Sequence, residues 1–187
     1  TKFMANIKKG NEIDIMGPLG RGYDVLSLKK GQTALLVGGG IGVPPLYELA
    51  KQFNQRGVKT IAILGFNSKD EVFYEDEFKK FGETYISTVD GSIGTKGFVT
   101  DVIKKLQAEN NLTFDKYYSC GPVPMLKALV STVGEDGYVS LENRMACGIG
   151  ACYACVCKKK KKDKNKDDYT RVCYDGPVYL ASDIIIE

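Results

Sequence analysis

Apolar positions between residues 33 and 141 follow two alternating patterns. Short runs rich in apolar, β-branched and aromatic residues are typical of strands that helices cover on both faces. They occupy residues 33–37, 58–64, 84–89, 116–119 and 138–141. Segments with helical periodicity separate them, so the chain predicts an α/β fold with a doubly wound, parallel, five-stranded sheet.

The helices are predicted from apolar residues that recur three or four positions apart. Such groups are Leu46, Leu49, Ala50 and Phe53; Phe78 and Phe81; Val99, Val102, Ile103 and Leu106; and Leu126, Leu129 and Val130. Gly57 ends the first helix and Pro122 opens the last.

The two ends of the chain lack this alternation. Residues 142–187 are rich in Cys and Gly and contain a lysine run. So few apolar residues build little core of their own, which predicts a small domain held together by a bound cofactor. At the other end, residues 12–16 read as a strand ahead of the sequence GPLG, and the start of the chain looks like the tail of a preceding domain.

Composition narrows the class of protein. The chain has 187 residues, 43% hydrophobic and 26% charged, which is a globular composition. Its net charge of +3 misleads, because residues 158–168 alone hold seven Lys and three Asp and the rest is near neutral. A general nucleic-acid footprint is therefore not supported, and this run is either a solvated hairpin tip or a basic docking surface for an acidic partner. No apolar run has the length of a membrane span and no signal peptide is visible, so the cytoplasm is expected.

The cysteines carry the most specific chemistry. Cys147, Cys152 and Cys155 have the spacing C-x4-C-x2-C, and Cys173 follows after 17 intervening residues. This is the plant-type [2Fe–2S] arrangement, in which the fourth thiolate comes from a separate segment. The small residues between the first two cysteines leave room for backbone N–H groups to approach the bridging sulfides. The chain has no His, so any metal must be held by Cys or carboxylates.

Two alternatives to a [2Fe–2S] cluster are weaker. Zinc prefers paired C-x2-C knuckles, and only one such pair is present. A disulfide framework suits a secreted chain better than one of cytoplasmic type. The remaining cysteine of the stretch, Cys157, is read as a small buried neighbour of the cluster in preference to a ligand.

Two glycine turns stand where a nucleotide would bind. VGGGIGVPP, residues 37–45, follows a strand and opens a helix, the context in which backbone N–H groups meet a pyrophosphate. Pro44 replaces the third glycine of G-x-G-x-x-G, so the turn alone is equally compatible with a structural role. SCGPVPM, residues 119–125, opens another helix after a later strand. Cys120 in it either faces the same crevice or is a buried structural cysteine.

Together these segments resemble the electron-transfer subunits of type B dihydroorotate dehydrogenase, in the ferredoxin–NADP reductase superfamily. GGGIGVPP, SCGPVPM and CGIGACYACVC carry the resemblance, with EVFYEDEF, DGSIGTKGFVTDVI and VCYDGPVY in support. It implies three parts: a remnant of an FAD-binding β-barrel at 1–28, an NAD-binding domain at 29–138 and a [2Fe–2S] domain at 139–187. Most of the barrel is missing, so the chain holds only part of a flavin site.

The resemblance also implies a function in pyrimidine biosynthesis. NADH gives hydride to FAD, and electrons pass singly through the cluster to FMN on a dihydroorotate dehydrogenase catalytic subunit, in a heterotetramer. The alternatives are a related NAD(P)H:ferredoxin or sulfide-type oxidoreductase subunit and, outside enzymes, a zinc-stabilised interaction module. NADH is expected over NADPH, because no Arg follows the second strand and Lys69 is the nearest cation. The nearest acids are Asp70 and Glu71.

The implied site residues fall into four groups. The dinucleotide site would take Gly39, Gly40, Gly42, Val43 and Pro44. The nicotinamide would lie near Cys120, Gly121 and Pro122, with Met125 beside the cofactor. FAD would contact Thr1, Met16, Gly17, Pro18, Leu19 and Gly20. The cluster would be held by Cys147, Cys152, Cys155 and Cys173.

Overall fold

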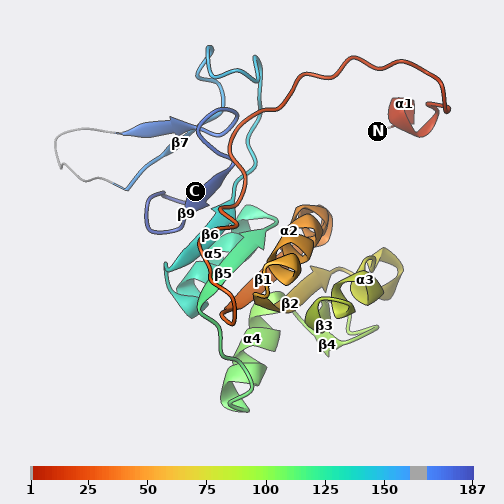
Figure 1. Ribbon diagram of the computed structural model, residues 1–187, viewed down its shortest axis with the longest axis vertical. Helices are drawn as coiled ribbons and strands as arrows, with labels where there is room; N and C mark the ends of the chain where they lie inside the picture. The colour runs from red at the N-terminus through yellow and green to blue at the C-terminus, as the bar shows by residue number, and fades with distance from the viewer. Residues whose placement is uncertain (1, 161–167) are drawn as a thin grey trace.

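A mixed seven-stranded sheet forms the centre of the protein, seen in a computed structural model that describes residues 2–160 and 168–187 (Figure 1). Its order is β4-β3-β2-β1-β5-β6-β9. The strands are β1 (Thr33–Gly39), β2 (Lys59–Phe66), β3 (Gly82–Thr88), β4 (Thr95–Lys96), β5 (Lys116–Cys120), β6 (Gly137–Ser140) and β9 (Val178–Leu180). The five expected strands are all present and parallel, and the sheet has two short strands more, of which β9 is antiparallel.

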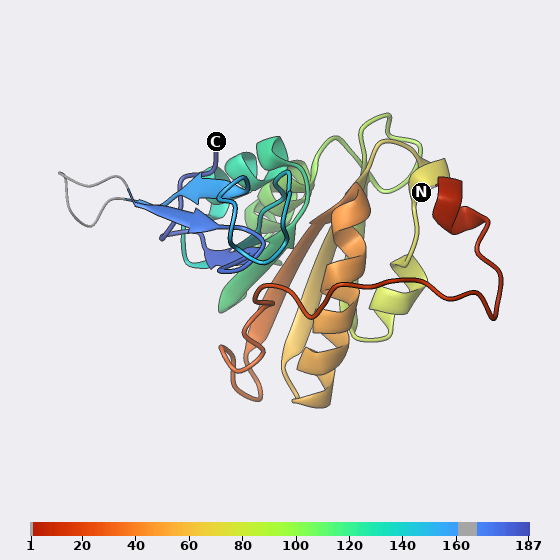
Figure 2. The same ribbon diagram turned by 90° about the horizontal axis from the view of Figure 1, so that it is seen from above.

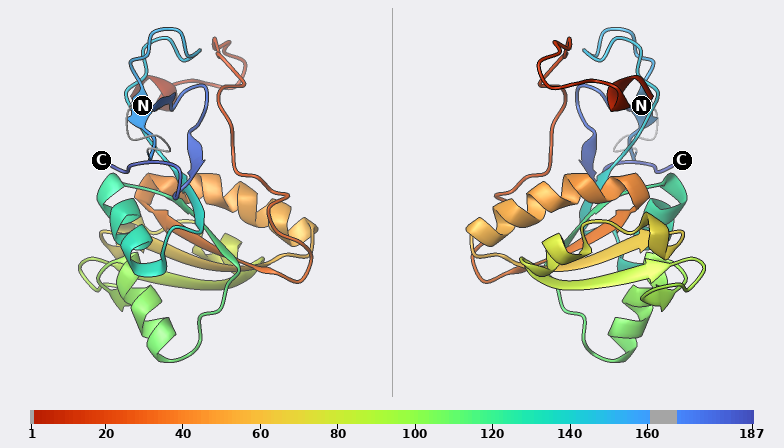
Figure 3. Two further views of the ribbon diagram at one scale, coloured as in Figure 1. Left: turned by 90° about the vertical axis from the view of Figure 1, so that its left-hand side faces the viewer. Right: turned by 90° about the vertical axis from the view of Figure 1, so that its right-hand side faces the viewer.

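Helices cover both faces of the sheet, as the doubly wound prediction requires (Figure 3). They are α2 (Val43–Gln55), α3 (Glu75–Lys79), α4 (Val99–Ala108) and α5 (Val123–Val133), with short 3-10 turns η1 (Gly40–Gly42) and η2 (Lys69–Glu71). The predicted apolar stripes of α2 and α3 pack on one face, and those of α4 and α5 on the other. The central strand β1 is buried along six of its seven residues, because both helical layers meet over it.

The C-terminal segment is joined to the sheet through its last strand. Val139 of β6 pairs with Tyr179 of β9, and a separate hairpin is formed by β7 (Val156–Lys158) and β8 (Tyr169–Arg171). Figure 2 shows this blue segment gathered at the β6 edge of the sheet. The expected hairpin around the lysine run is therefore confirmed in its two strands. Its tip lies outside the described residues. The expected domain boundary between residues 138 and 139 falls inside β6.

The N-terminal segment is an extended arm that leads to the one-turn helix α1 (Lys2–Ala5), remote from the sheet (Figure 1). The predicted strand over residues 12–16 is wrong: these residues are extended but pair with no strand of the described chain. Apolar side chains along the arm, among them Phe3 and Ile15, are exposed. The arm is fixed to the sheet further on, where the Tyr23 hydroxyl donates to the carbonyl of Ser119 at 2.8 Å. Among the described helices, none combines the length and apolarity of a membrane span.

Candidate functional site

The two glycine turns predicted from the sequence touch each other at the carboxyl edge of the sheet. A Cβ at Gly42 would overlap the carbonyl of Cys120 and lie 2.7 Å from the backbone nitrogen of Gly121. A Cβ at Gly39 would lie 2.6 Å from the sulfur of Met125. The atoms next to Gly42 belong to the backbone and cannot turn aside, so the close approach of the β1–α2 turn to the β5–α5 turn requires glycine at that position, whereas the Met125 side chain beside Gly39 is flexible.

A cavity of about 370 Å³ opens beside these turns, at the carboxyl ends of β1, β2 and β3. This is the edge at which doubly wound sheets bind their ligands. Four predicted residues line it: Gly39, Gly40, Pro122 and Met125. Phe66, Asn67 and Phe98 also line it and were not predicted, although Phe66 ends β2, Asn67 directly follows it and Phe98 directly precedes α4.

The first turn of α2, which follows the cavity-lining Gly40, has few free hydrogen-bond donors. Pro44 and Pro45 have no N–H, and the N–H of Val43 already bonds to the carbonyl of Gly40. The proline in place of a third glycine is accommodated because the first helical turn lacks intrahelical partners in any case. Any pyrophosphate here is attracted mainly by the dipole and by the N–H groups of the turn itself.

Cys120 does not line the cavity. It is 5% exposed and belongs to the apolar cluster on the α2 face, whereas the cavity is lined by residues of α4 and α5. Burial raises the pKa of its thiol, with Ser140 as a hydrogen-bond partner. Burial also raises the pKa of Tyr23, which lies close to this thiol. Of the Cys-Gly-Pro turn, Pro122 reaches the cavity wall and Cys120 lies in the core below it.

A carboxylate from the η2 turn that follows β2 lines the cavity. Glu71 lines the cavity and accepts a hydrogen bond from the Asn67 amide at 2.8 Å. Its neighbours Lys69 and Asp70 are not part of the lining. The charge presented to a ligand here is therefore negative.

The four cysteines of the predicted cluster are brought together as two pairs. The sulfur of Cys147 accepts the N–H groups of Ala151 at 3.3 Å and Cys152 at 3.4 Å. The N–H of Cys152 is the main cause that lowers the pKa of the Cys147 thiol to about 6. The sulfur of Cys155 accepts the N–H of Cys173 at 3.4 Å, and this neighbouring side chain raises the pKa of Cys173.

Two thiol pairs fit the donor set of a two-iron cluster, because each iron takes two thiolates in addition to the two bridging sulfides. Within residues 2–160 and 168–187, no three Cys, Asp or Glu side chains are grouped as they would be around a single metal ion. Amide N–H groups already point at the Cys147 and Cys155 sulfurs, which is the environment that thiolate ligands need. The residues present therefore fit a [2Fe–2S] cluster.

The fourth cysteine of the stretch is separate from these pairs. Cys157 stands opposite Thr170 in the β7–β8 hairpin and is half-buried against the core of the α4 face. Burial raises the pKa of its thiol. Its role as a packing neighbour stays a prediction.

The arm predicted to contact flavin lies against the cluster loop. A hollow of about 370 Å³ is lined by Pro18, Leu19, Gly20, Arg21, Gly148, Ile149, Cys173 and Tyr174. The backbone N–H of Arg21 donates to the carbonyl of Gly176, and the sulfur of Met16 reaches Gly148. Gly17 lies in the same stretch, and Thr1 lies outside the described residues. The arm thus places the predicted flavin residues next to the predicted cluster.

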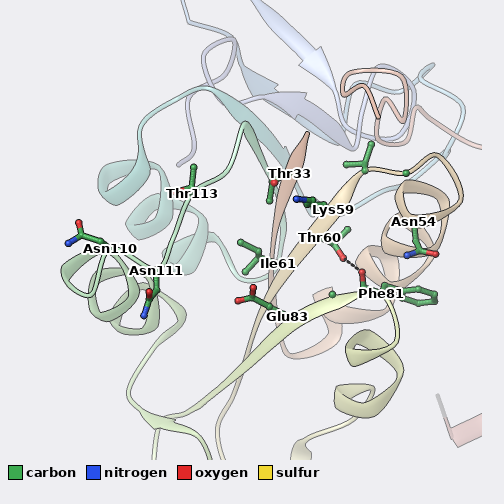
Figure 4. A pocket seen from close by; sticks show the side chains of 13 residues that line it. Thr33, Asn54, Lys59, Thr60, Ile61, Phe81, Glu83, Asn110, Asn111 and Thr113 are labelled. Carbon is green, nitrogen blue, oxygen red and sulfur yellow. Dashed lines mark hydrogen bonds between the residues drawn. The ribbon is translucent and has the colours of Figure 1, made fainter. Parts of the chain in front are cut away.

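A larger hollow than either of these lies at the opposite edge of the sheet (Figure 4). It measures about 560 Å³ and is lined by polar residues such as Thr33, Lys59 and Asn111 at the amino ends of the strands. None of the predicted site residues lines it. Size alone therefore does not identify the functional site in this fold.

Two protein families match parts of the chain. Residues 36–131 match the oxidoreductase NAD-binding domain. Residues 142–185 match the iron–sulfur cluster binding domain of dihydroorotate dehydrogenase B. The first match covers both glycine turns, and the second covers the two cysteine pairs.

Curated relatives match the chain over almost its whole length. It is 90% identical over 187 residues to the electron transfer subunit of dihydroorotate dehydrogenase B (NAD(+)) of Fusobacterium nucleatum, covering all of this chain and 71% of that protein. It is 57% identical over 180 residues to the subunit of the same name from Lysinibacillus sphaericus, covering 96% of this chain and 68% of that protein.

Solved structures share the fold. An NADH-dependent reduced ferredoxin-NADP oxidoreductase, studied for flavin-based electron bifurcation, is 30% identical with a TM-score of 0.83, over 99% of this chain and 64% of that one. The cytochrome b5 reductase domain of Ulva prolifera nitrate reductase is 15% identical with a TM-score of 0.56, over 74% of this chain and 62% of that one. The second likeness concerns the fold alone.

Proposed function

The chain belongs to the family of electron-transfer subunits of dihydroorotate dehydrogenase B, and from this premise we propose that it connects NADH to an FMN-containing catalytic subunit. Electrons would pass from NADH through FAD and a [2Fe–2S] cluster to that subunit, in the oxidoreductase of pyrimidine biosynthesis. One observation carries the proposal: the arm residues predicted to contact flavin and the cluster segment line one hollow, in which Pro18 to Arg21 lie beside Gly148 and Cys173.

The division of labour follows from what each group can do. Bound FAD accepts two electrons from a nicotinamide and releases them one at a time, which a [2Fe–2S] cluster can carry. The protein supplies binding and orientation. Gly39, Gly40 and Gly42, followed by Val43 and Pro44 of α2, would receive the pyrophosphate at the dipole of that helix.

The nicotinamide end of the crevice is assigned to the β5–α5 turn. Pro122 and Met125 form part of the wall, and Gly121 lets the turn approach Gly39. Cys120 would act from beneath this turn as a packing group. The carboxylate of Glu71 supports NADH over NADPH, because a 2′-phosphate beside it would meet like charge.

The cluster is assigned to Cys147, Cys152, Cys155 and Cys173, and the flavin contacts to Thr1 and residues 16–20. We keep the division into 1–28, 29–138 and 139–187. The family matches at 36–131 and 142–185 support it, because they fall within the second and third parts. The cytoplasm is proposed as the compartment, since all six cysteines are free thiols.

The test is reconstitution of the complete subunit with an FMN-containing dihydroorotate dehydrogenase subunit under anaerobic conditions. We expect the two to co-purify as a heterotetramer and to reduce NAD+ with dihydroorotate. NADPH should reduce the flavin much more slowly than NADH in stopped-flow mixing. Failure of the two subunits to associate, or a complex without NAD-linked turnover, would contradict the proposal.

A second candidate acceptor is a ferredoxin. It is favoured by the likeness to the NADH-dependent reduced ferredoxin-NADP oxidoreductase at 30% identity. The same reconstituted subunit, given ferredoxin in place of the catalytic subunit, distinguishes the two. We expect no rapid ferredoxin reduction, and a rate equal to that with the catalytic subunit would favour the second candidate.

A further inference from the structure

Arg171, the last residue of β8, holds two segments of the cluster region at once. Its Nε and Nη2 donate to the two carboxylate oxygens of Asp175, at 2.9 and 3.2 Å. Its Nη1 donates to the carbonyl of Gly150 at 3.0 Å. The guanidinium is a rigid planar fork, so using three of its nitrogens in this way fixes both partners relative to β8.

Two tyrosines restrict the guanidinium further. Its central carbon lies 4.6 Å from the ring centroid of Tyr174 and 5.4 Å from that of Tyr153. Such cation–π contacts favour a guanidinium that lies against the ring faces. Tyr153 belongs to the loop with the first three cysteines, and Tyr174 follows the fourth. Arg171 therefore contacts the chain on both sides of the predicted cluster.

The loop is shaped to receive this side chain. Gly150 has a φ of +79°, a conformation that other residues adopt only with strain. A Cβ there would also lie 2.9 Å from Tyr174 and 3.2 Å from Nη1 of Arg171. The backbone of the loop thus packs directly on the guanidinium and its stacking partner.

The contact to Gly150 has a geometric consequence. The carbonyl of Gly150 and the N–H of Ala151 belong to one planar peptide unit, in which the two groups point in opposite directions. The N–H of Ala151 donates to the sulfur of Cys147 at 3.3 Å. When Arg171 holds the carbonyl, it also fixes the direction of the N–H that reaches the thiol.

We propose that Arg171 is a positioning residue for the cluster, which sets the reduction potential by holding the Gly150–Ala151 peptide so that Ala151 donates to Cys147. Hydrogen bonds to the sulfurs stabilise the reduced, more negative cluster and raise its potential. Loss of the orientation lowers the potential and loosens the loop. The inference rests on the proposed assignment of the four cysteines as cluster ligands.

The experiment compares four variants of the complete subunit in complex with its catalytic partner. R171K keeps the charge but cannot donate hydrogen bonds to Asp175 and Gly150 at the same time. R171Q removes the charge as well. D175A removes the carboxylate that orients the guanidinium of Arg171 through two hydrogen bonds. R144Q is the matched control, since it removes an equally positive, exposed side chain three residues before Cys147.

The readouts are iron per chain and the midpoint potential, from an anaerobic titration followed by visible absorption and electron paramagnetic resonance. We expect R171K, R171Q and D175A to have more negative midpoints than the wild type. The D175A result is decisive, because removal of a negative charge by itself would shift the midpoint in the positive direction. If the loop is disturbed more strongly, R171K should lose iron while R144Q keeps its full iron content, and this result would also support the proposal.

Three results would overturn the inference. They are a wild-type midpoint in R171K, a positive shift in D175A, and equal shifts in R171Q and R144Q, which would indicate a simple effect of charge. A wild-type subunit that binds no iron would instead contradict the proposed function. The two failures are therefore distinguishable in the same set of samples.

Discussion

Replacing Gly42 with alanine tests the contact between the two glycine turns. Gly42 has a φ of −75° and a ψ of −8°, which alanine adopts without strain, so the substitution adds only a methyl group. That methyl would overlap the Cys120 carbonyl and press on the Gly121 nitrogen. Both are backbone atoms, which cannot turn aside as a flexible side chain can, so one of the two turns must move.

The size of the effect follows from two opposing terms. Overpacking of this kind costs about 1–3 kcal/mol. Alanine also reduces the freedom of the unfolded chain, which offsets about 0.4–1 kcal/mol. At the middle of both ranges the overlap exceeds the offset by about 1.3 kcal/mol, which corresponds to an unfolding midpoint roughly 3–5 °C lower in a chain of this size. Displacement of the turn should also weaken NADH binding by about tenfold, the equivalent of about 1.4 kcal/mol.

The assay is thermal unfolding by circular dichroism, together with titration of NADH on the complete subunit. The control is G22A: Gly22 has no left-handed φ and no atom within 4 Å of an added Cβ. This control should match or slightly exceed the wild type in stability. A G42A variant that unfolds and binds NADH like the wild type would refute the argument, as would an equal loss in G22A.

Three further predictions follow from the same structure. C152S should lose iron because it breaks one thiol pair, whereas C157S should keep it, and iron analysis of the two variants checks this; equal iron in both would contradict the assignment of ligands. L126A, which empties a fully buried position of α5, should cost about 2–5 kcal/mol in urea unfolding, while L26A at a 67% exposed position should change stability by less than about 0.5 kcal/mol. The backbone N–H of Thr33, with the Gln32 amide, lowers the pKa of Asp115 from 3.8. The ionised carboxylate therefore stabilises the fold above that value, and this contribution is lost as the pH falls through the folded-state pKa. D115N should make unfolding less sensitive to acid below about pH 4, and an unchanged pH profile would argue against this.

The layers of the fold could be predicted because they depend on local periodicity. Leu46, Leu49 and Phe53 recur at helical spacing, and all three lie on the buried face of α2. The strands were equally predictable, and several of them pair with the next strand in the sequence, as β1 does with β2. The pattern at residues 12–16 failed because alternation predicts an extended chain, whereas a strand also needs a partner, and the described chain offers none.

Sites that depend on contacts between distant segments were only partly visible. The cysteine spacing predicts the four cluster cysteines, three of which lie within nine residues, whereas their arrangement as two pairs is visible only in the structure. The position of Cys120 could not be predicted, because the face of β5 on which it lies depends on the register with β1. Arg171 was missed for the same reason: only its spacing to Asp175 is local, and its contact to Gly150 spans 21 residues.

The pairing of β9 with β6 has a consequence for solubility. Without β9, the backbone N–H and C=O groups along one side of β6 would be unpaired, and an open strand edge is a template for association with another sheet. A chain that ends before Val178 should therefore aggregate even though its NAD-binding segment is complete. The last ten residues therefore cover the open edge of β6, in addition to being part of the cluster segment.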